Sequence, residues 1–129
     1  MSAPEDFDLL AKAKAHFRDQ ITGASLEIEV PEWGLSFHVR PPTLKERARM
    51  LELTRARGVG SFAEIVVLRA RTAAGVPMFQ AAQVGELEGQ VDAGVLEVVG
   101  TKILNFDTKL MEARTQGGTV GELEGARGN

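Results

Sequence analysis

The chain has 129 residues, about the length of one ordinary domain, and its 43% hydrophobic and 26% charged residues are typical of a globular protein. It contains no cysteine, which excludes disulfides and thiolate metal sites, and only 5% of its residues are aromatic, so its core has to be built mainly from aliphatic side chains. No apolar run approaches the roughly 18 residues of a membrane span, and the first 20 residues are too charged for a secretory signal, so we expect a cytoplasmic protein.

The N-terminal stretch has the pattern of a helix. Its apolar residues recur at helical spacing between residues 4 and 21, and they are Leu9, Leu10, Ala13, Phe17 and Ile21. Asp6 and Asp8 lie near the start, where negative charge interacts favourably with the helix dipole. We expect residues 1–25 to form an N-terminal helix or arm.

Residues 26–40 have the pattern of a β-hairpin. Apolar residues alternate with polar ones in two runs, which contain Leu26, Ile28 and Val30, then Leu35, Phe37 and Val39. This period of two gives each strand one apolar and one polar face. Pro31 and Gly34 favour a turn between the strands. Pro41-Pro42 ends the second strand because proline cannot donate a backbone hydrogen bond.

A helix is predicted over residues 43–57, because Thr43 and Glu46 have the spacing of a capping box. We expect its buried side to contain Leu44, Ala48 and Leu51, with Met50 a further candidate. Gly58 and Gly60 are expected to end it.

A second helix is predicted over residues 61–74, where Ser61 and Glu64 repeat the capping pattern. Residues 65–68 are all apolar, so this helix is expected to be the most buried element, with Arg69 and Arg71 complementing the dipole at its end. We expect Gly75 to terminate it and residues 76–79 to be extended, with their apolar side chains closing the edge of the core.

The last helix is predicted over about residues 90–106, after a stretch that forms a short helix at best. Gly94 and Gly100 each cost it roughly 1 kcal/mol relative to alanine but permit close helix contact. Leu110 and Met111 could extend it by a turn or two, within a Gly-rich segment, 107–129, that is expected to be a flexible tail.

The predicted fold class is therefore α+β and mainly α-helical. It comprises an N-terminal helix, one β-hairpin, a small bundle of three to four helices and a flexible C-terminal tail. Residues 26–106 are expected to form the single globular domain.

No catalytic or metal-binding constellation is recognisable. The chain has two histidines, His16 and His38. His38 lies on the polar face of the second strand with no serine or cysteine nucleophile placed for it, and no calcium-binding loop is present. The acidic pairs Glu27 with Glu29 and Glu86 with Glu88 are interpreted as solvated surface. We predict a protein that is not an enzyme and that needs no cofactor or metal.

Basic residues are concentrated in the middle of the chain. Residues 40–71 contain eight basic and three acidic residues, whereas the segments 1–39 and 72–129 each have a net charge of −4. This middle region is either a set of solvated helix faces or a surface that receives an acidic partner or the protein's own acidic tail. The candidate protein-binding residues in it are Arg40, Arg47, Arg49 and Arg55.

Two aromatic residues, Trp33 and Phe79, are further candidates for protein binding. Trp33 falls in the hairpin turn, and a large aromatic side chain there either covers the core or anchors an interface.

Several short motifs occur in an order that is similar to a known family. They are Glu29-Val30, Gly34, Val39-Arg40-Pro41, Thr43 with Glu46-Arg47, and Gly75-x-Pro77-Met78-Phe79. This order resembles the tail assembly chaperones of long-tailed bacteriophages, prophages and gene transfer agents. The resemblance covers roughly residues 26–104, and the N-terminal helix has no clear counterpart in it.

The resemblance implies a small non-enzymatic protein in the cytoplasm of a bacterial host. Such proteins bind the tape-measure protein, recruit tail-tube subunits and leave before the tail is complete, so the chain is not expected in the mature particle. A homo-oligomer is compatible with the free edges of the hairpin, and neither nucleic acid nor membrane is an expected partner. The alternatives are a small DNA-binding regulator that uses the basic region 40–71, or a structural tail protein.

Overall fold

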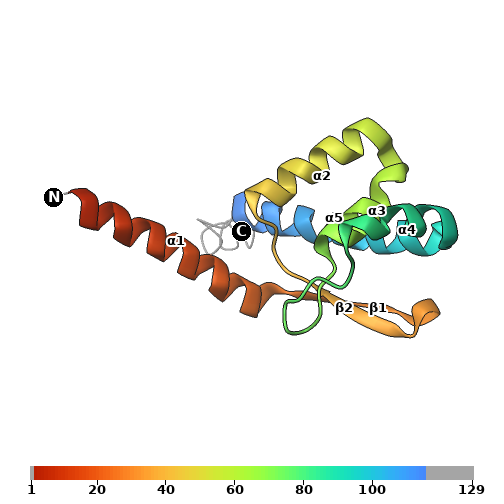
Figure 1. Ribbon diagram of the computed structural model, residues 1–129. Coiled ribbons are helices and arrows are strands. Elements are labelled where there is room, and N and C mark those ends of the chain that lie inside the picture. Colours follow the sequence, from red (N-terminus) through yellow and green to blue (C-terminus); the bar gives the residue numbers. More distant parts are fainter. Residues whose placement is uncertain (1, 116–129) are drawn as a thin grey trace, which may run out of the picture.

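The computed structural model describes the backbone of residues 2–115 and the side chains of residues 9–21 and 23–115. The fold is mainly helical, with one antiparallel two-stranded sheet (Figure 1). The elements in order are α1 (Ser2–Ala24), β1 (Leu26–Val30), β2 (Leu35–Val39), α2 (Leu44–Arg57), α3 (Phe62–Arg69), α4 (Val84–Gln90) and α5 (Ala93–Thr115). The predicted fold class, α+β and mainly α-helical, is confirmed.

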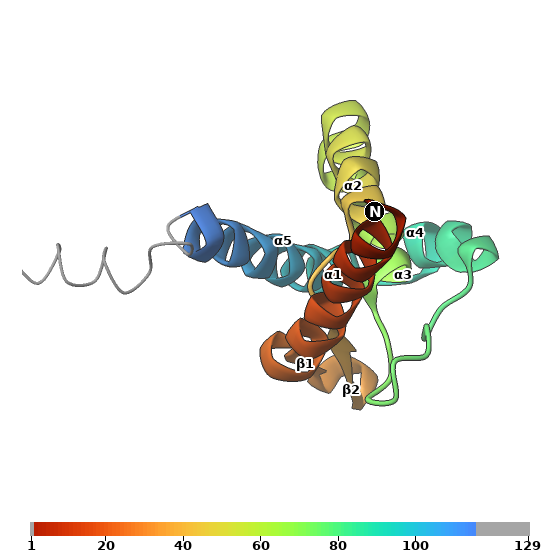
Figure 2. The same cartoon turned by 90° about the vertical axis from the view of Figure 1, so that its left-hand side faces the viewer.

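The helix α1 extends away from the rest of the molecule in Figure 1. In Figure 2, which is seen from the left-hand side of Figure 1, the N-terminal end of the same helix lies in front of the other helices. The helix is longer than the apolar pattern of residues 4–21 indicated. Near its C-terminal end the ring of Phe17 lies 5.6 Å from the guanidinium carbon of Arg40, a cation–π contact. Leu9 and Leu10, further out, are exposed.

The hairpin has the predicted pairing, with Leu26 opposite Val39 and Ile28 opposite Phe37. Its inward-facing residues Ile28, Val30, Phe37 and Val39 are all buried. A short 3-10 turn, Pro31–Trp33, joins the strands, and Gly34 follows with a φ of 68°, a conformation that favours glycine.

The helix α2 begins with the predicted capping box. The Glu46 amide donates to the Thr43 hydroxyl at 3.2 Å, and the Thr43 amide donates to the Glu46 carboxylate at 3.0 Å. The predicted buried side is wrong, however: Leu44 and Leu51 are 84% and 49% exposed, and Ala48 is exposed as well.

The residues of α2 that are buried are Met50 and Leu53. The helix therefore has two apolar stripes, and the fold uses the one that faces α3, where the Met50 sulfur lies 3.3 Å from Arg69 Nη1. The stripe of Leu44, Ala48 and Leu51 remains on the surface.

The helix α3 ends at Arg69, five residues before the predicted end. The chain instead becomes extended, because Arg71 pairs with the outer edge of β2 through two backbone hydrogen bonds to His38, of 2.7 and 2.9 Å. A turn with Gly75 at a φ of 87° then returns the chain, and the Met78 amide donates to the Ala70 carbonyl at 3.0 Å. The segment thus covers part of the edge of the hairpin.

The predicted cap at Ser61 is also wrong. The Ser61 hydroxyl is buried and donates to the Gly58 carbonyl at 2.6 Å, within the 3-10 turn Gly58–Ser61 that joins α2 to α3. Glu64 is engaged in ion pairs with Arg57 and Arg49 instead of reaching back to Ser61.

The C-terminal region is more helical than predicted. A short helix, α4, precedes α5, which begins where the Asp92 carboxylate accepts from the Val95 amide at 3.0 Å. The prediction of a tail from residue 107 is wrong up to residue 115, because α5 continues through Thr115. The remainder of the predicted tail, 116–129, lies outside the described residues.

The core is built mainly where α3 and α5 pack together beside the hairpin. The buried apolar residues of these two helices are Ala63, Ile65, Val66, Val95, Leu96, Val99 and Ile103. Gly100 allows the close approach, since a Cβ atom there would lie 2.6 Å from the Phe62 ring. The predicted close helix contact is thus observed at Gly100.

A buried ion pair joins the same two helices. Arg69 and Asp107 are each 1% exposed, and the two guanidinium nitrogens of Arg69 lie 2.5 and 2.9 Å from the Asp107 carboxylate oxygens. Arg69 Nη2 also donates to the Arg40 carbonyl at 2.6 Å. The pair therefore connects α3, α5 and the segment that leads into α2.

Candidate protein-binding surfaces

The described residues contain no group of three or more histidine, aspartate or glutamate side chains that could hold a metal ion. Between residues 2 and 115, no helix has the length and apolarity to cross a membrane.

Acidic residues of the same chain form ion pairs with many arginines of the predicted basic surface. Arg40 donates to Glu46 at 3.1 Å, and Arg49 lies 3.4 Å from both Glu52 and Glu64. Arg69 is buried in its pair with Asp107. These pairs weaken the DNA-binding alternative, which needs the arginines of residues 40–71 free for phosphates.

Arg47 and Arg55 differ from the other candidate arginines. Neither makes an ion pair or a side-chain hydrogen bond with the described residues. Both lie on α2, and Arg55 is exposed. The predicted basic surface is thus reduced to a few positions on this helix.

Trp33 and Phe79 lie together at the turn end of the hairpin. Their ring centroids are 6.4 Å apart with an interplanar angle of 75°, an edge-to-face arrangement. Both are half-buried and pack against the core. This packing favours the interpretation that Trp33 covers the core, and the role of the pair as binding residues stays a prediction.

An open apolar groove runs between the N-terminal half of α2 and the C-terminal end of α5. Its volume is about 370 Å³, and its lining comprises Pro42, Thr43, Leu44, Arg47, Ala48, Leu51, Asp107, Leu110, Met111 and Arg114. We call it the α2–α5 groove. Leu44, Leu51 and Met111 are exposed in it, the last by 43%. An exposed apolar lining of this kind is a feature of grooves that bind amphipathic helices.

Charge at the α2–α5 groove is positive. Arg47 and Arg114 line it and make no ion pair with the described residues, whereas the Asp107 carboxylate is already bound to Arg69. The groove therefore favours an apolar segment that has acidic residues beside it.

Sequence reasoning missed this groove because it assigned Leu44 and Leu51 to the core. It allowed a helical extension through Leu110 and Met111 but placed both residues in a segment expected to be a flexible tail. The available signal was that α2 has more apolar positions than one buried stripe needs, with Leu44, Ala48 and Leu51 at spacings of four and three.

The capping box keeps one end of the α2–α5 groove in place. Burial raises the pKa of Glu46, but the hydrogen bond from the Thr43 amide, the hydrogen bond from Arg40 and the charges of Arg40 and Arg69 together hold the pKa below its ordinary value. Glu46 is therefore ionised at neutral pH and orders the start of α2.

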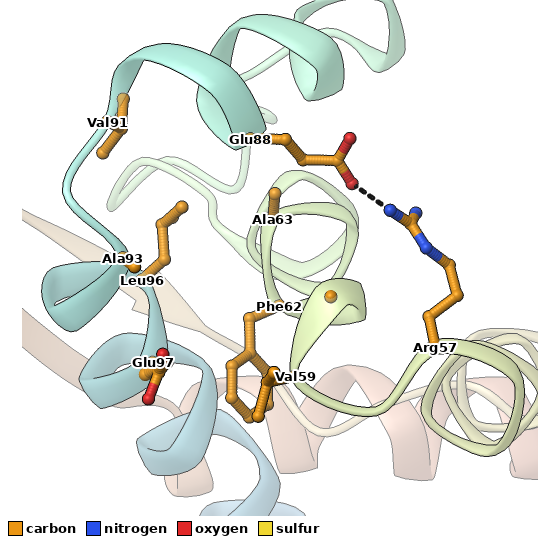
Figure 3. A pocket seen from close by; sticks show the side chains of 10 residues that line it. Arg57, Val59, Phe62, Ala63, Glu88, Val91, Ala93, Leu96 and Glu97 are labelled. Carbon is orange, nitrogen blue, oxygen red and sulfur yellow. Dashed lines mark hydrogen bonds and ion pairs between the residues drawn. The ribbon is translucent and has the colours of Figure 1, made fainter.

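A second hollow, of about 320 Å³, lies where the α2–α3 turn faces α4 and α5 (Figure 3). Val59, Phe62 and Leu96 project into it, and Arg57 points across to Glu88, with Nη2 2.6 Å from the carboxylate. Hydrogen bonds to Glu88 and Glu64 raise the pKa of Arg57. Since these ion pairs join α2 to α3 and α4, we interpret the hollow as a structural joint.

The hairpin, the capped helix and the α3–α5 pair define a small, mainly helical α+β domain whose surface features are suited to binding protein. A solved structure with this fold is the tail assembly chaperone of bacteriophage HK97, with a TM-score of 0.52 and 16% sequence identity over 67% of this chain and 89% of that chain. The resemblance inferred from the sequence is thus confirmed at the level of the fold. No protein-family model matches the chain, and no curated protein matches it.

Proposed function

We propose that this protein is a phage tail assembly chaperone, a non-enzymatic protein that binds other tail proteins during assembly. The observation that supports this most strongly is the fold shared with the HK97 tail assembly chaperone. The open α2–α5 groove supports it independently, because a protein that binds unassembled partners needs apolar surface that its own fold leaves uncovered.

The client in this proposal is the tape-measure protein, and its contact is the α2–α5 groove. Leu44, Leu51 and Met111 provide exposed apolar area for one face of an amphipathic helix. Arg47 and Arg114 lie beside them and pair with acidic residues of the client. Binding of this kind keeps an apolar helix in solution and remains reversible.

Recruitment of tail-tube subunits requires a second surface. The remaining predicted binding residues, Trp33 and Phe79 at the hairpin turn and Arg40, Arg49 and Arg55 around α2, are the candidates for it. In this proposal the protein works in the cytoplasm of the bacterial host and leaves before the tail is complete.

The proposal is tested by co-expression with the candidate client, a tape-measure protein from the same genome as this chain. We expect the tape-measure protein to become more soluble and to co-purify with the chaperone. If it is equally soluble without this chain and no complex is recovered, the proposal is wrong.

A further inference from the structure

The fold covers one edge of the hairpin and leaves the other open. On the β2 side, His38 exchanges two backbone hydrogen bonds with Arg71, and the returning segment lies along that edge. On the β1 side, no backbone segment within the described part of the chain pairs with the strand. An open edge of this kind presents backbone donors and acceptors that can pair with another extended chain.

The register of the hairpin identifies the backbone groups at the open edge. Glu27 lies opposite His38, and His38 directs both its amide and its carbonyl toward Arg71. Opposite residues of antiparallel strands alternate between hydrogen-bonded and non-hydrogen-bonded pairs, so Glu27 directs its own amide and carbonyl away from β2. The same holds two residues along at Glu29, which lies opposite Ser36. The open edge therefore presents the N–H and C=O groups of Glu27 and Glu29.

A groove runs along this edge, between β1 and α5. It consists of two adjoining hollows of about 450 and 390 Å³, which share Glu29 and Lys102 in their lining. The wall formed by α5 contains Val98, which is 55% exposed, and the half-buried ring of Phe106. We call it the β1 groove. The five residues of β1 span about 16 Å, the length of an added strand of equal size.

We propose that the β1 groove binds an extended segment of a partner protein, which adds a third strand to the hairpin. The backbone of the segment pairs with the amides and carbonyls of Glu27 and Glu29, and its inward-facing side chains contact Val98 and Phe106. In this mode of recognition, main-chain hydrogen bonds supply affinity and alternate side chains supply specificity.

Charge specifies the side chains of the segment. On the outer face of β1, Glu27 and Glu29 are exposed, so the residues opposite them are basic, because opposite charges on paired strands attract. On the inner face, Lys102 and Lys109 of α5 line the groove, so the residues that face this helix are apolar and not basic. The preferred segment therefore alternates basic with apolar residues.

The same charges disfavour two other occupants. A second copy that paired through its own β1 would bring glutamates next to glutamates, which is unfavourable. Residues 116–129 contain Glu122 and Glu124 with a single basic residue, Arg127, so they lack the alternation of basic with apolar residues. A segment of a different protein is thus the occupant with matching chemistry.

The first test measures amide hydrogen exchange by NMR in the wild-type chain, with and without a short peptide in which lysine alternates with valine. We expect saturating peptide to slow exchange of the Glu27 and Glu29 amides about tenfold or more, because they become hydrogen-bonded. The Ile28 amide, which faces β2, is the internal control. Unchanged exchange at Glu27 and Glu29 overturns the inference. Protection of both amides in the free protein also overturns it, since the edge is then already occupied.

The second test compares peptide affinities by fluorescence anisotropy. We expect a peptide with glutamate in place of lysine to bind about tenfold more weakly, and the double variant Glu27→Lys with Glu29→Lys to reverse this preference. The control variant, Glu86→Lys with Glu112→Lys, makes the same charge change at exposed glutamates outside the groove. Equal preference in the two double variants overturns the inference.

Methylation of single peptide nitrogens separates strand addition from simple charge attraction. It should weaken binding of the lysine–valine peptide at every second position, because only alternate amides of an added strand face β1. A uniform effect along the peptide overturns the inference. These measurements involve no tail protein, so they are independent of the proposed chaperone function.

Discussion

The two halves of α5 are used in different ways. The N-terminal half buries Val95, Val99 and Ile103 against the core and has Gly100 where Phe62 approaches. Beyond Asp107 the same helix presents Met111 and Arg114 to the α2–α5 groove. The buried ion pair of Asp107 with Arg69 lies at the boundary between the two halves. Substitutions before Asp107 should therefore lower the stability of the fold, whereas substitutions after it should weaken binding in the α2–α5 groove.

The largest loss of stability is expected from Asp107→Ala. The substitution leaves the Arg69 guanidinium buried without its carboxylate, which typically costs about 3–5 kcal/mol of unfolding free energy. Urea denaturation followed by circular dichroism measures it. The double variant Arg69→Met with Asp107→Leu is the control, because replacing both charges by apolar side chains costs far less. A loss below about 1 kcal/mol for Asp107→Ala would contradict the importance of the pair.

A smaller loss is expected from Gly100→Ala. The new Cβ would lie 2.6 Å from the Phe62 ring, and overpacking of this kind costs about 1–3 kcal/mol. Gly89→Ala is the matched control, because no atom lies within 4 Å of a Cβ there and alanine is the better helix former. The same denaturation assay should show opposite signs for the two variants, and equal effects would argue against close packing of α3 on α5.

The capping box is expected to contribute less. Thr43→Ala removes the acceptor for the Glu46 amide and should lower the unfolding free energy by about 1 kcal/mol. Thr43→Ser keeps the hydroxyl and serves as the control. If Thr43→Ala and Thr43→Ser are equally stable, the hydroxyl does not cap the helix.

The pH dependence of stability should report on Glu46. Its pKa is lower in the folded than in the unfolded chain, so its contribution is present above the ordinary pKa of 4.5 and is lost as the pH falls through the lower, folded value. The stability advantage of the wild type over Glu46→Gln should therefore shrink below pH 4.5, in thermal melts at a series of pH values. A constant difference between pH 7 and pH 3 would refute this.

The hairpin and the start of α2 could be predicted because their determinants are local. The alternation of Ile28 and Val30 with glutamates sets the faces of the strand, and Thr43 lies three residues from Glu46. Patterns of this length require no knowledge of distant residues.

The errors came from contacts between distant residues. The burial of Arg69 could not be predicted from the local pattern because its partner, Asp107, is 38 residues away. The predicted extension of α3 to residue 74 failed because pairing of Arg71 with His38 competes with the helix.

The α2–α5 groove was missed for a related reason. Both Leu44 and Met50 belong to apolar stripes of α2, and only the position of α3 determines which stripe is buried. A sequence pattern reports that a surface is apolar but does not report whether the fold or a partner covers it.

The central claim is that the α2–α5 groove serves binding and not folding. It is tested most directly by titrating the tape-measure protein with the wild type and with Leu51→Glu, and by comparing their unfolding free energies. We predict that Leu51→Glu changes the unfolding free energy by no more than about 0.5 kcal/mol, because the residue is on the surface, while binding is lost. Undiminished binding by Leu51→Glu, or a large loss of its stability, would contradict the claim.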